Sequence, residues 1–543
     1  MPVSKSRTVG QPKAIDSRLI ESLLASPDIN QAAGTPELIE THISWVILAG
    51  DFVYKIKKPV KLDFLDFREL ERRRFFCNEE LRLNRYWAPE IYLDVIPITL
   101  ENGKPGFAGR GQPVEYAVRM RRFEQARLLT QELDHGTLTV DDMRELGAHI
   151  ADRHLAAKAI DASQRDRYLR KTAQFIRDNF KALETHLEAR DLQPIRDWSE
   201  RQLGALEPLL KERFDRQLVR NCHGDLHLRN LVRLPEGIRA FDCVEFDRDL
   251  RHIDVFCDIA FLLIDLVVRR RHDLAANFLD RYLERTGDYQ GMQVFSLFFV
   301  YRCLVRAKVA AIRMSERPGQ QDSVADREEM NRYVDMARRQ IANRKPILLI
   351  MSGLSGSGKT WVSAKLVGAL PAIRVRADVE RKRLFGLHES AASGSAVGGG
   401  IYTNEASQQV YRRLNDIAAS MLEHQHNVIL DAAFLSKADR AAAIELARAS
   451  GQLAVLVEVT APIPVMQKRL EQRAILAADA SEAGVEVLQH QLGIAEPVED
   501  SEGPLVIRID NTGEINLSQV VARIKQAARC HSSSENELPP SGN

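Results

Sequence analysis

The chain contains 543 residues with a mass of 61.3 kDa, which is too long for a single hydrophobic core and predicts about three or four structural units. It carries 76 basic and 75 acidic side chains, so the net charge of +1 creates no global field that would attract nucleic acid or anionic lipid. No segment approaches the roughly 20 apolar residues of a membrane span, and the first residues lack the apolar stretch of a signal peptide. Six cysteines without a CxxC pair indicate a reducing compartment, so we expect a cytoplasmic protein without a membrane anchor.

After a polar extension at 1–35, the pattern at 36–125 predicts a small α+β lobe. Two apolar runs flank a Gly-Asp turn, which is typical of a hairpin. A charged, periodic segment then predicts a helix, and two further apolar runs predict strands. In chain order these are strands at 42–48 and 52–57, a helix at 67–87, and strands at 91–99 and 114–121.

The next part, 126–345, predicts a helical lobe that ends in a linker helix. Apolar residues are spaced three and four apart over 140–215 and again over 254–345, as in amphipathic helices. Between them, 221–246 has the character of a loop with short strands. The charge-rich end of this part stops at Pro346, which marks a boundary.

From 346 to 529 strands and helices alternate, which predicts a parallel sheet covered on both faces. A glycine-rich piece from Ser393 to Gly400 predicts a mobile loop near a site, and 530–543 predicts a disordered tail. The expected strands are 346–352, 372–377, 427–433, 452–460 and 504–510. One expected helix begins at 359, and the others span 404–425, 437–450, 464–475 and 515–528.

The run GLSGSGKT at 353–360 follows an apolar strand and predicts a phosphate-binding loop for ATP or GTP with magnesium. Its glycines let successive backbone N–H groups point at a phosphate, and the following helix adds its positive end. The lysine is expected to reach the β and γ phosphates, and the threonine hydroxyl to bind magnesium. The expected nucleotide-binding residues are Gly353, Ser355, Gly356, Ser357, Gly358, Lys359 and Thr360.

Two acids follow strands of the same part. Asp431 ends the apolar strand at 427–431, where a P-loop fold places its magnesium-linked acid. Asp378 follows the second strand. This half resembles small-molecule and nucleic-acid kinases, which implies that Asp378 acts as base and a neighbouring arginine as clamp for an acceptor hydroxyl; the alternative is an Asp that caps the next helix.

Arg469 and Arg473 lie four residues apart, just before the loose stretch 477–484. Arginines on a closing lid would neutralise charge on the transferred phosphoryl group. The alternative is an ordinary solvated helix face.

The string HGDLHLRN at 223–230 predicts a second phosphotransfer centre. Protein kinases place a catalytic-loop Asp and an Asn five residues apart, with a magnesium-binding Asp on a following hairpin. By this spacing Asp225 orients the acceptor hydroxyl, Asn230 and Asp242 bind magnesium, and His223 braces the loop.

The strings HGDLHLRN and FDCVEF, followed by Asp258, resemble the aminoglycoside phosphotransferase and choline kinase superfamily over roughly 40–340. This resemblance implies a protein-kinase-like bilobal α+β domain followed by an α/β P-loop kinase domain. It also implies that Lys55 or Lys57 anchors phosphate and pairs with Glu79 or Glu80, the alternative being a lysine-rich strand edge. The whole chain resembles bacterial two-domain proteins in which such a domain is fused to a P-loop ATP-binding domain of the AAA, zeta-toxin or polynucleotide-kinase type.

These patterns lead to three functional hypotheses. The first is an ATP- and magnesium-dependent phosphotransferase with two centres acting on small-molecule hydroxyls. The second makes the first half a non-catalytic sensor that regulates the P-loop half, because no GxGxxG flap precedes the hairpin. The third makes the P-loop half a polynucleotide 5′-kinase, which the near-zero net charge disfavours. The sequence does not indicate the acceptors or the oligomeric state.

Overall fold

The computed structural model describes residues 17–26, 29, 35–62, 65–316, 321–396, 398–476 and 481–534. These residues form two compact units. The first comprises the chain up to Leu138 with Lys158–Tyr168 and Phe214–Asp258, and the second comprises Thr139–Ala157, Leu169–Arg213 and the chain from Ile259. The second unit includes helices that precede Pro346, which pack with the P-loop part.

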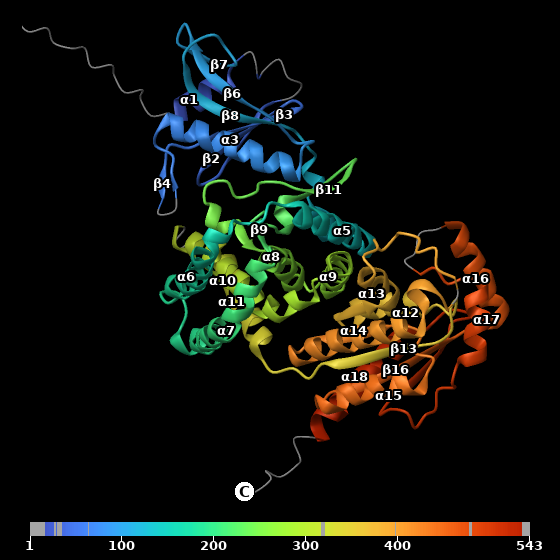
Figure 1. Ribbon diagram of the computed structural model, residues 1–543. Helices are drawn as coiled ribbons and strands as arrows, with labels where there is room; N and C mark the ends of the chain where they lie inside the picture. The colour runs from blue at the N-terminus through green and yellow to red at the C-terminus, as the bar shows by residue number, and fades with distance from the viewer. Residues whose placement is uncertain are drawn as a thin grey trace, which may run out of the picture. The chain divides into compact units, whose positions relative to one another are not determined.

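The first unit contains a six-stranded antiparallel sheet in the order β1-β2-β3-β8-β6-β7. Residues of β2 and β3 that alternate along the strands, such as Ile47 and Ile56, pack with Ile98 and with Ile20 of α1 on one face. Cys77 of α3 packs with Val118 on the other face. The strands are β1 (Glu37–Glu40), β2 (Ser44–Ala49), β3 (Phe52–Lys57), β6 (Tyr92–Glu101), β7 (Lys104–Phe107) and β8 (Pro113–Arg121), and the helices are α1 (Ser17–Leu24), α3 (Leu70–Trp87) and α4 (Leu129–Asp134) (Figure 1).

Short strand pairs in the first unit hold the segment that contains HGDLHLRN. Strand β9 (Val219–Asn221) pairs with β12 (His252–Asp254), and β10 (Leu231–Leu234) pairs with β11 (Gly237–Ala240), both antiparallel. A further small pair, β4 (Lys61–Leu62) and β5 (Leu65–Asp66), precedes α3. The predicted catalytic loop therefore runs between β9 and β10, and Asp242 follows β11.

The second unit contains a five-stranded, entirely parallel sheet in the order β14-β15-β13-β16-β17. Its central strand β13 is buried along its whole length, as expected for a strand covered on both faces. The strands are β13 (Ile347–Ser352), β14 (Ala372–Arg376), β15 (Asn427–Asp431), β16 (Leu453–Thr460) and β17 (Val506–Asp510).

Helices around this sheet include one from before Pro346. Leu349 and Met351 of β13 pack with Leu366 of α12, Ile524 of α18 and Ala276 of α9, so all three helices cover one face (Figure 1). The helices of the P-loop part are α12 (Lys359–Ala369), α13 (Ala377–Leu384), α14 (Asn404–Glu423), α15 (Lys437–Ala449), α16 (Ile463–Leu476), α17 (Val485–Ile494) and α18 (Leu517–Ser534). The preceding helices of this unit are α5 (Val140–Ala156), α9 (His272–Thr286), α10 (Met292–Glu316) and α11 (Gln321–Ile341), while α6 (Arg165–Leu183), α7 (Ala189–Asp215) and α8 (Val255–Val268) contain residues of both units.

These elements confirm the predicted fold class, an α+β part followed by an α/β part with a parallel sheet. All five predicted strands of the sheet are present, each within two residues at its start. The sequence analysis missed α1, inside the expected extension, and also β7, α13 and α17. Helix α18 continues to Ser534, so the first residues of the expected disordered tail are helical; 535–543 lie outside the described residues.

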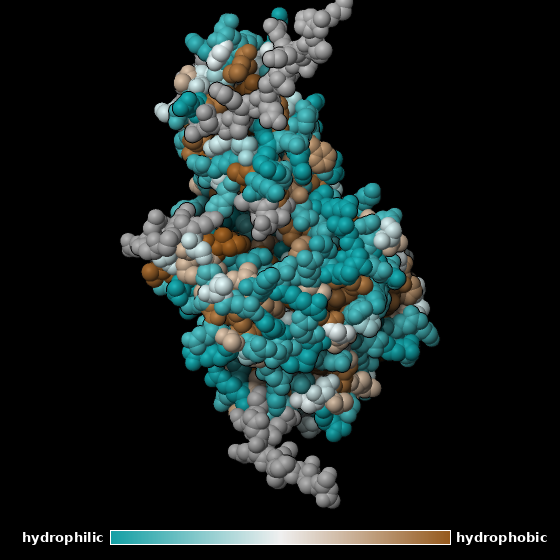
Figure 2. All heavy atoms as spheres, turned by 90° about the vertical axis from the view of Figure 1, so that its left-hand side faces the viewer, coloured by the Kyte–Doolittle hydropathy of each residue, from teal (hydrophilic) through white to brown (hydrophobic). Residues whose placement is uncertain are grey.

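Within the described ranges, no helix combines the length and the apolar character that crossing a bilayer requires. On the face drawn in Figure 2 hydrophilic residues predominate and apolar residues form small groups.

Candidate active sites

The phosphate-binding loop lies between the end of β13 and the start of α12. Gly353, Gly356 and Gly358 have φ values of 142°, 82° and 95°, which an L side chain rarely adopts. A Cβ at Gly353 would collide with the carbonyl oxygen of Val459, and one at Gly358 with the side chain of Asn511. These two glycine positions of the loop are therefore closed to a residue with a side chain.

The oxygen ligands expected for magnesium meet at the base of this loop. Thr360, in the first turn of α12, has its Oγ1 at 3.5 Å from Oδ1 of Asp431, which ends the adjacent strand β15. Ser363 donates a hydrogen bond of 2.8 Å to the other carboxylate oxygen of Asp431. A hydroxyl and a carboxylate beside a phosphate cradle are the oxygen donors that magnesium prefers, so these residues fit the ion.

Lys359 lies beside the same acids. Its Nζ donates a hydrogen bond of 2.9 Å to the carbonyl of Leu354. Burial lowers the pKa of Lys359 to about 8, although the Asp431 and Asp378 carboxylates act in the opposite direction. The ammonium group is thus close to both predicted acids of the P-loop part.

A cavity of about 1690 Å³ opens above the loop and brings the predicted P-loop residues together. Its wall includes Asp378 in the first turn of α13. The N-cap of that helix is Arg376, so Asp378 does not occupy the capping position that was the alternative interpretation. The predicted residues that line the cavity are Ser355, Gly356, Gly358, Lys359, Thr360, Asp378, Asp431, Arg469 and Arg473.

The two arginines of α16 face this cavity and not open solvent. Arg469 donates hydrogen bonds to the carbonyls of Ser357, at 3.2 Å, and Asn511, at 2.6 Å, so it braces the loop. Arg473 donates a hydrogen bond of 2.5 Å to the carbonyl of Ala483, and its charge helps to lower the pKa of Lys359. Both arginines therefore line the cavity beside the phosphate-binding loop.

Two further charged side chains line this cavity: Arg381, a neighbour of Asp378 of the kind that the resemblance implied as a clamp, and Glu482, which was not predicted. Arg381 is buried, donates to the carbonyl of Ile401 at 2.8 Å and stacks over the ring of Tyr402. Glu482 accepts hydrogen bonds from the backbone and hydroxyl of Ser393, at 2.9 and 2.5 Å, and pairs with Lys382 at 3.1 Å. Glu482 has no motif around it, because its partners Ser393 and Lys382 come from separate segments.

The second centre lies within the first unit, around the loop between β9 and β10. Asn230 donates hydrogen bonds of 2.9 and 3.0 Å to the side chain and backbone carbonyl of Asp225. Asp242 has a φ of 61° and a backbone N–H that donates to the hydroxyl of Tyr92 at 3.1 Å. Phe241, next to Asp242, donates its backbone N–H to the carbonyl of Asn230 at 2.9 Å, so the three residues that the motif predicted lie in one region.

Both candidate lysines of β3 are engaged with acids. Lys55 lies 2.5 Å from Asp242 and 2.8 Å from Glu80, and Lys57 lies 2.8 Å from Glu80 and also contacts Glu245. Although burial alone would raise it, the two ammonium groups lower the pKa of Glu80 to about 2. Burial raises the pKa of Glu245, with the neighbouring Glu80 carboxylate acting in the same direction and Lys57 against it.

Glu80 is thus the residue of α3 that contacts the lysines. Glu79 points elsewhere and forms an ion pair with Arg82 at 2.7 Å, because neighbouring helical residues face about 100° apart. Glu245, in the string FDCVEF, was missed as a site residue; an acid inside an apolar run was the available signal.

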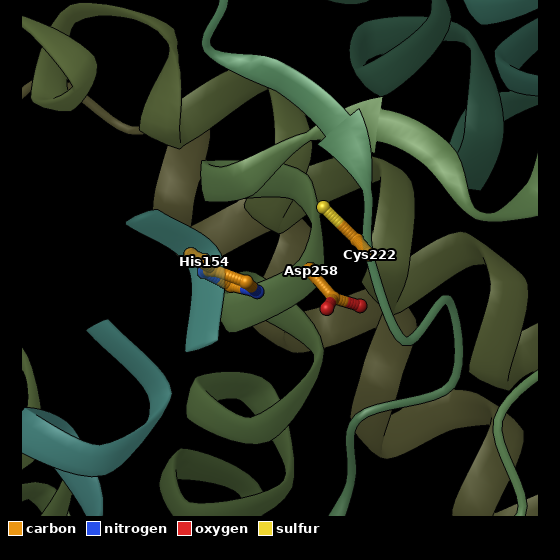
Figure 3. Close-up of side chains that lie close together, drawn as sticks. All are labelled: His154, Cys222 and Asp258. Carbon is orange, nitrogen blue, oxygen red and sulfur yellow. The ribbon is translucent and has the colours of Figure 1, made fainter. Parts of the chain in front are cut away.

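Asp258 braces the catalytic loop. Its two carboxylate oxygens accept the backbone N–H groups of His223, at 2.9 Å, and Gly224, at 2.8 Å. Figure 3 shows this carboxylate in the first turns of α8 and the side chain of Cys222, which directly follows β9 and leads into the loop. His223 also has Nε2 at 2.9 Å from the carbonyl of Phe241, and burial lowers its pKa, which favours a neutral ring that donates to that carbonyl.

With this geometry in place, the P-loop part can be compared with known families. Residues 348–498 match the family model described as an AAA domain. The match runs from β13 to the segment just before β17. It covers the phosphate-binding loop, Asp378, Asp431 and both arginines of α16.

The similarity of this chain to its relatives extends beyond the residues that match the AAA domain. Uncharacterized proteins of Mycobacterium tuberculosis and Mycobacterium bovis are 29% identical over 453 residues, which cover 81% of this chain and 87% of each relative. Among solved structures, a choline/ethanolamine kinase family protein from Mesorhizobium loti matches at 12% identity, 60% of this chain, 95% of that chain and a TM-score of 0.38. A gluconokinase from Sinorhizobium meliloti matches at 18% identity, 36% of this chain, 100% of that chain and a TM-score of 0.25.

Proposed function

We propose that the protein is an ATP- and magnesium-dependent phosphotransferase with two separate centres, each acting on the hydroxyl group of a small molecule. The observation that carries the proposal is the P-loop cavity. Lys359, Thr360 and Asp431 line this cavity together with Asp378. A phosphate cradle supports nucleotide binding. An additional carboxylate facing the same space supports transfer to an acceptor, because it can accept a proton there.

At the P-loop centre the work of the chain is positioning and charge neutralisation. Bound ATP would supply the phosphoryl group. Thr360 and Asp431 would hold magnesium, while Lys359 and Arg473 neutralise the developing negative charge. Asp378 accepts the proton of the acceptor hydroxyl, and Arg469 keeps the loop closed through the carbonyl of Ser357.

At the second centre Asp225 has the role of orienting the acceptor hydroxyl and accepting its proton. Asn230 and Asp242 carry the amide and carboxylate oxygens that suit magnesium. Lys55 is the better phosphate anchor of the two lysines, since its side chain is 12% exposed whereas that of Lys57 is 1% exposed and enclosed by acids. This assignment makes the first unit catalytic and not a sensor.

A label-transfer screen tests the proposal. ATP labelled in its γ-phosphate is incubated with pooled cellular metabolites and with the wild type, Asp225→Asn or Lys359→Ala. We expect two sets of labelled products, each lost with one substitution. Matched controls are Glu79→Gln, next to Glu80 on α3, and Lys365→Ala, an exposed lysine on α12; both should keep every product.

Two other outcomes would change the assignment. The Asp225 variant could keep all labelled products, while formation of the products that need Lys359 depends on a ligand that binds to the part of the chain preceding Pro346. That result would make the first unit a sensor. If labelled oligonucleotides accumulate and their binding weakens steeply from low to physiological salt, the P-loop half is a polynucleotide 5′-kinase. Loss of all products with either substitution alone would contradict two independent centres.

A further inference from the structure

A helix that precedes Pro346 carries two buried acids against the P-loop sheet. Asp280 and Glu284 lie one turn apart on α9 and are 1% and 3% exposed. Facing them are Arg374 and Arg376, alternate residues of β14 whose side chains share one face of the sheet. Arg374 binds Asp280 with Nη2 at 2.9 Å and Nε at 3.3 Å, and Arg376 binds Glu284 at 2.7 Å.

The guanidinium of Arg374 has a second set of contacts, on the side of the phosphate-binding loop. Its Nη1 lies 3.3 Å from the backbone carbonyl of Thr360 and 3.3 Å from Oγ of Ser363. The same nitrogen is 3.8 Å from Oδ2 of Asp431. One buried arginine therefore joins Asp280 of α9 to the residues that would hold magnesium.

We propose that α9 is a working part of the P-loop centre, in which Asp280 and Arg374 are positioning residues for the pair Thr360 and Asp431. This inference rests on the proposed function of that centre. It adds that the metal site requires a carboxylate from a helix that lies before the P-loop part in the chain. Arg374 fixes the orientation of Asp431, and Asp280 fixes and neutralises Arg374.

The charges explain why Asp280 matters for a cation. A guanidinium next to a metal-binding carboxylate competes with the metal for that carboxylate. While Asp280 is bound to Arg374, the positive charge is compensated and Asp431 keeps its attraction for magnesium. Without the Asp280 charge, Arg374 would turn its full attraction toward Asp431 and repel an incoming divalent ion.

Further contacts fix the acids of α9 themselves. Arg144 of α5 lies 2.6 Å from Asp280 and 3.4 Å from Glu284. Arg281, which follows Asp280 on α9, forms an ion pair of 2.6 Å with Glu389 of the P-loop part. Glu284 in turn holds Arg376, which lines the cavity near Asp378. The acids are thus held from both sides, as a positioning role requires.

The test measures how strongly magnesium enhances nucleotide binding in the full chain. Energy transfer to a mant-labelled ATP is recorded with excess magnesium and with EDTA. Trp361 lines the P-loop cavity and is half exposed, so the signal that disappears in a Trp361→Phe background reports on this centre alone. The variants are Asp280→Asn and, as a matched control, Asp288→Asn, which weakens the buried pair of Arg213 and Asp288 at 2.9 Å.

We expect Asp280→Asn to reduce the enhancement by magnesium about tenfold, while affinity without metal stays within about threefold of the wild type. Asp288→Asn should keep the full enhancement even if it lowers the melting temperature equally. Should Asp280→Asn not fold, Arg374→Lys replaces it: a single ammonium cannot bind Asp280 and Thr360 together, and the enhancement should fall about fivefold.

An unchanged enhancement in the variant that is measured overturns the inference, and so does an equal loss of affinity with and without metal, which would indicate general damage. The proposed function fails in a different way: the wild type itself would then show no Trp361-dependent binding of the labelled nucleotide, or no transfer that depends on Lys359.

Discussion

The Nζ of Lys55 lies 2.5 Å from a carboxylate oxygen of Asp242, so a predicted phosphate anchor and a predicted magnesium ligand form an ion pair across 187 residues of sequence. The neighbouring Lys57 is instead enclosed by Glu80 and Glu245. The two lysines share Glu80 but differ in their second acid, Asp242 for Lys55 and Glu245 for Lys57, and this difference supports the different roles that we propose for them.

Substituting each lysine should therefore give opposite results. We expect Lys55→Met to lower the transfer that depends on Asp225 at least about a hundredfold, a loss of roughly 3 kcal/mol in transition-state stabilisation, with little change in melting temperature. Lys57→Met leaves the buried Glu245 without its lysine and Glu80 with Lys55 alone, and should lower the free energy of unfolding by about 3–5 kcal/mol. Label transfer and thermal melting are measured on both variants. Equal melting temperatures for the two would contradict this division of roles.

Replacing the Asp258 carboxylate by an amide should destabilise the predicted catalytic loop at 223–230. In Asp258→Asn an amide replaces one of the two oxygens that accept the N–H groups of His223 and Gly224, so one buried donor loses its partner. We expect a stability loss of about 2 kcal/mol and faster hydrogen exchange at 223–230. Asp247→Asn is the control, since Asp247 also accepts one backbone N–H, from Asp249 at 2.8 Å, but outside the loop. Protection of the loop equal to the wild type would show that Asp258 does not brace it.

Nucleotide binding at the P-loop should depend on pH through Lys359. Its pKa of about 8 without ligand means that the side chain is mostly charged at pH 7 and mostly neutral at pH 9. Phosphate groups favour the charged form, so binding at pH 9 should take up about one proton and affinity should fall as pH rises from 7 to 9. Calorimetry in two buffers of different ionisation enthalpy measures the uptake. Lys359→Arg stays charged and should show none; uptake in that variant would assign the proton to another group.

The contact of Glu482 with Ser393 should control access to the acceptor side of the cavity. Glu482→Gln removes the charge that binds Lys382 and weakens the two hydrogen bonds from Ser393. We expect hydrogen exchange at 393–396 to rise about tenfold, corresponding to a loss of about 1.4 kcal/mol in local stability. The exposed Glu486 of α17, which lines the same cavity, provides the control Glu486→Gln. Equal rates of hydrogen exchange at 393–396 in both variants would show that Glu482 does not stabilise this loop.

The elements of the P-loop part were predictable because their signals are local. Strand β13 is a continuous apolar run, and the glycines after it are required by backbone conformations of that same segment. Helix α13 was missed because it starts at Ala377, directly after β14, and has no side-chain cap to mark it. Helix α17 begins after Gly484 and likewise has no side-chain cap to mark its start.

Partners within the centres were less predictable. The sequence left Glu79 and Glu80 as equal alternatives, since they are adjacent acids on the same predicted helix. The rotation of α3 against β3 places Glu80, and not Glu79, next to the two lysines. Glu245 was not predicted as a site residue, and its contact with Lys57 becomes visible only in the fold. Arg381 was implied only as a neighbouring arginine of Asp378, and the fold places it over the ring of Tyr402.

By itself the sequence determined the fold class, the phosphate-binding loop at 353–360 and the spacing of Asp225 and Asn230, because glycine conformations and hydrophobic periodicity act over neighbouring residues. Tertiary structure alone decided which charges meet. Asp280 and Arg374 are 94 residues apart, and Lys57 and Glu245 are 188 apart. Such pairs depend on how helices pack against sheets, and a buried charge is stable only where that packing brings its partner within reach.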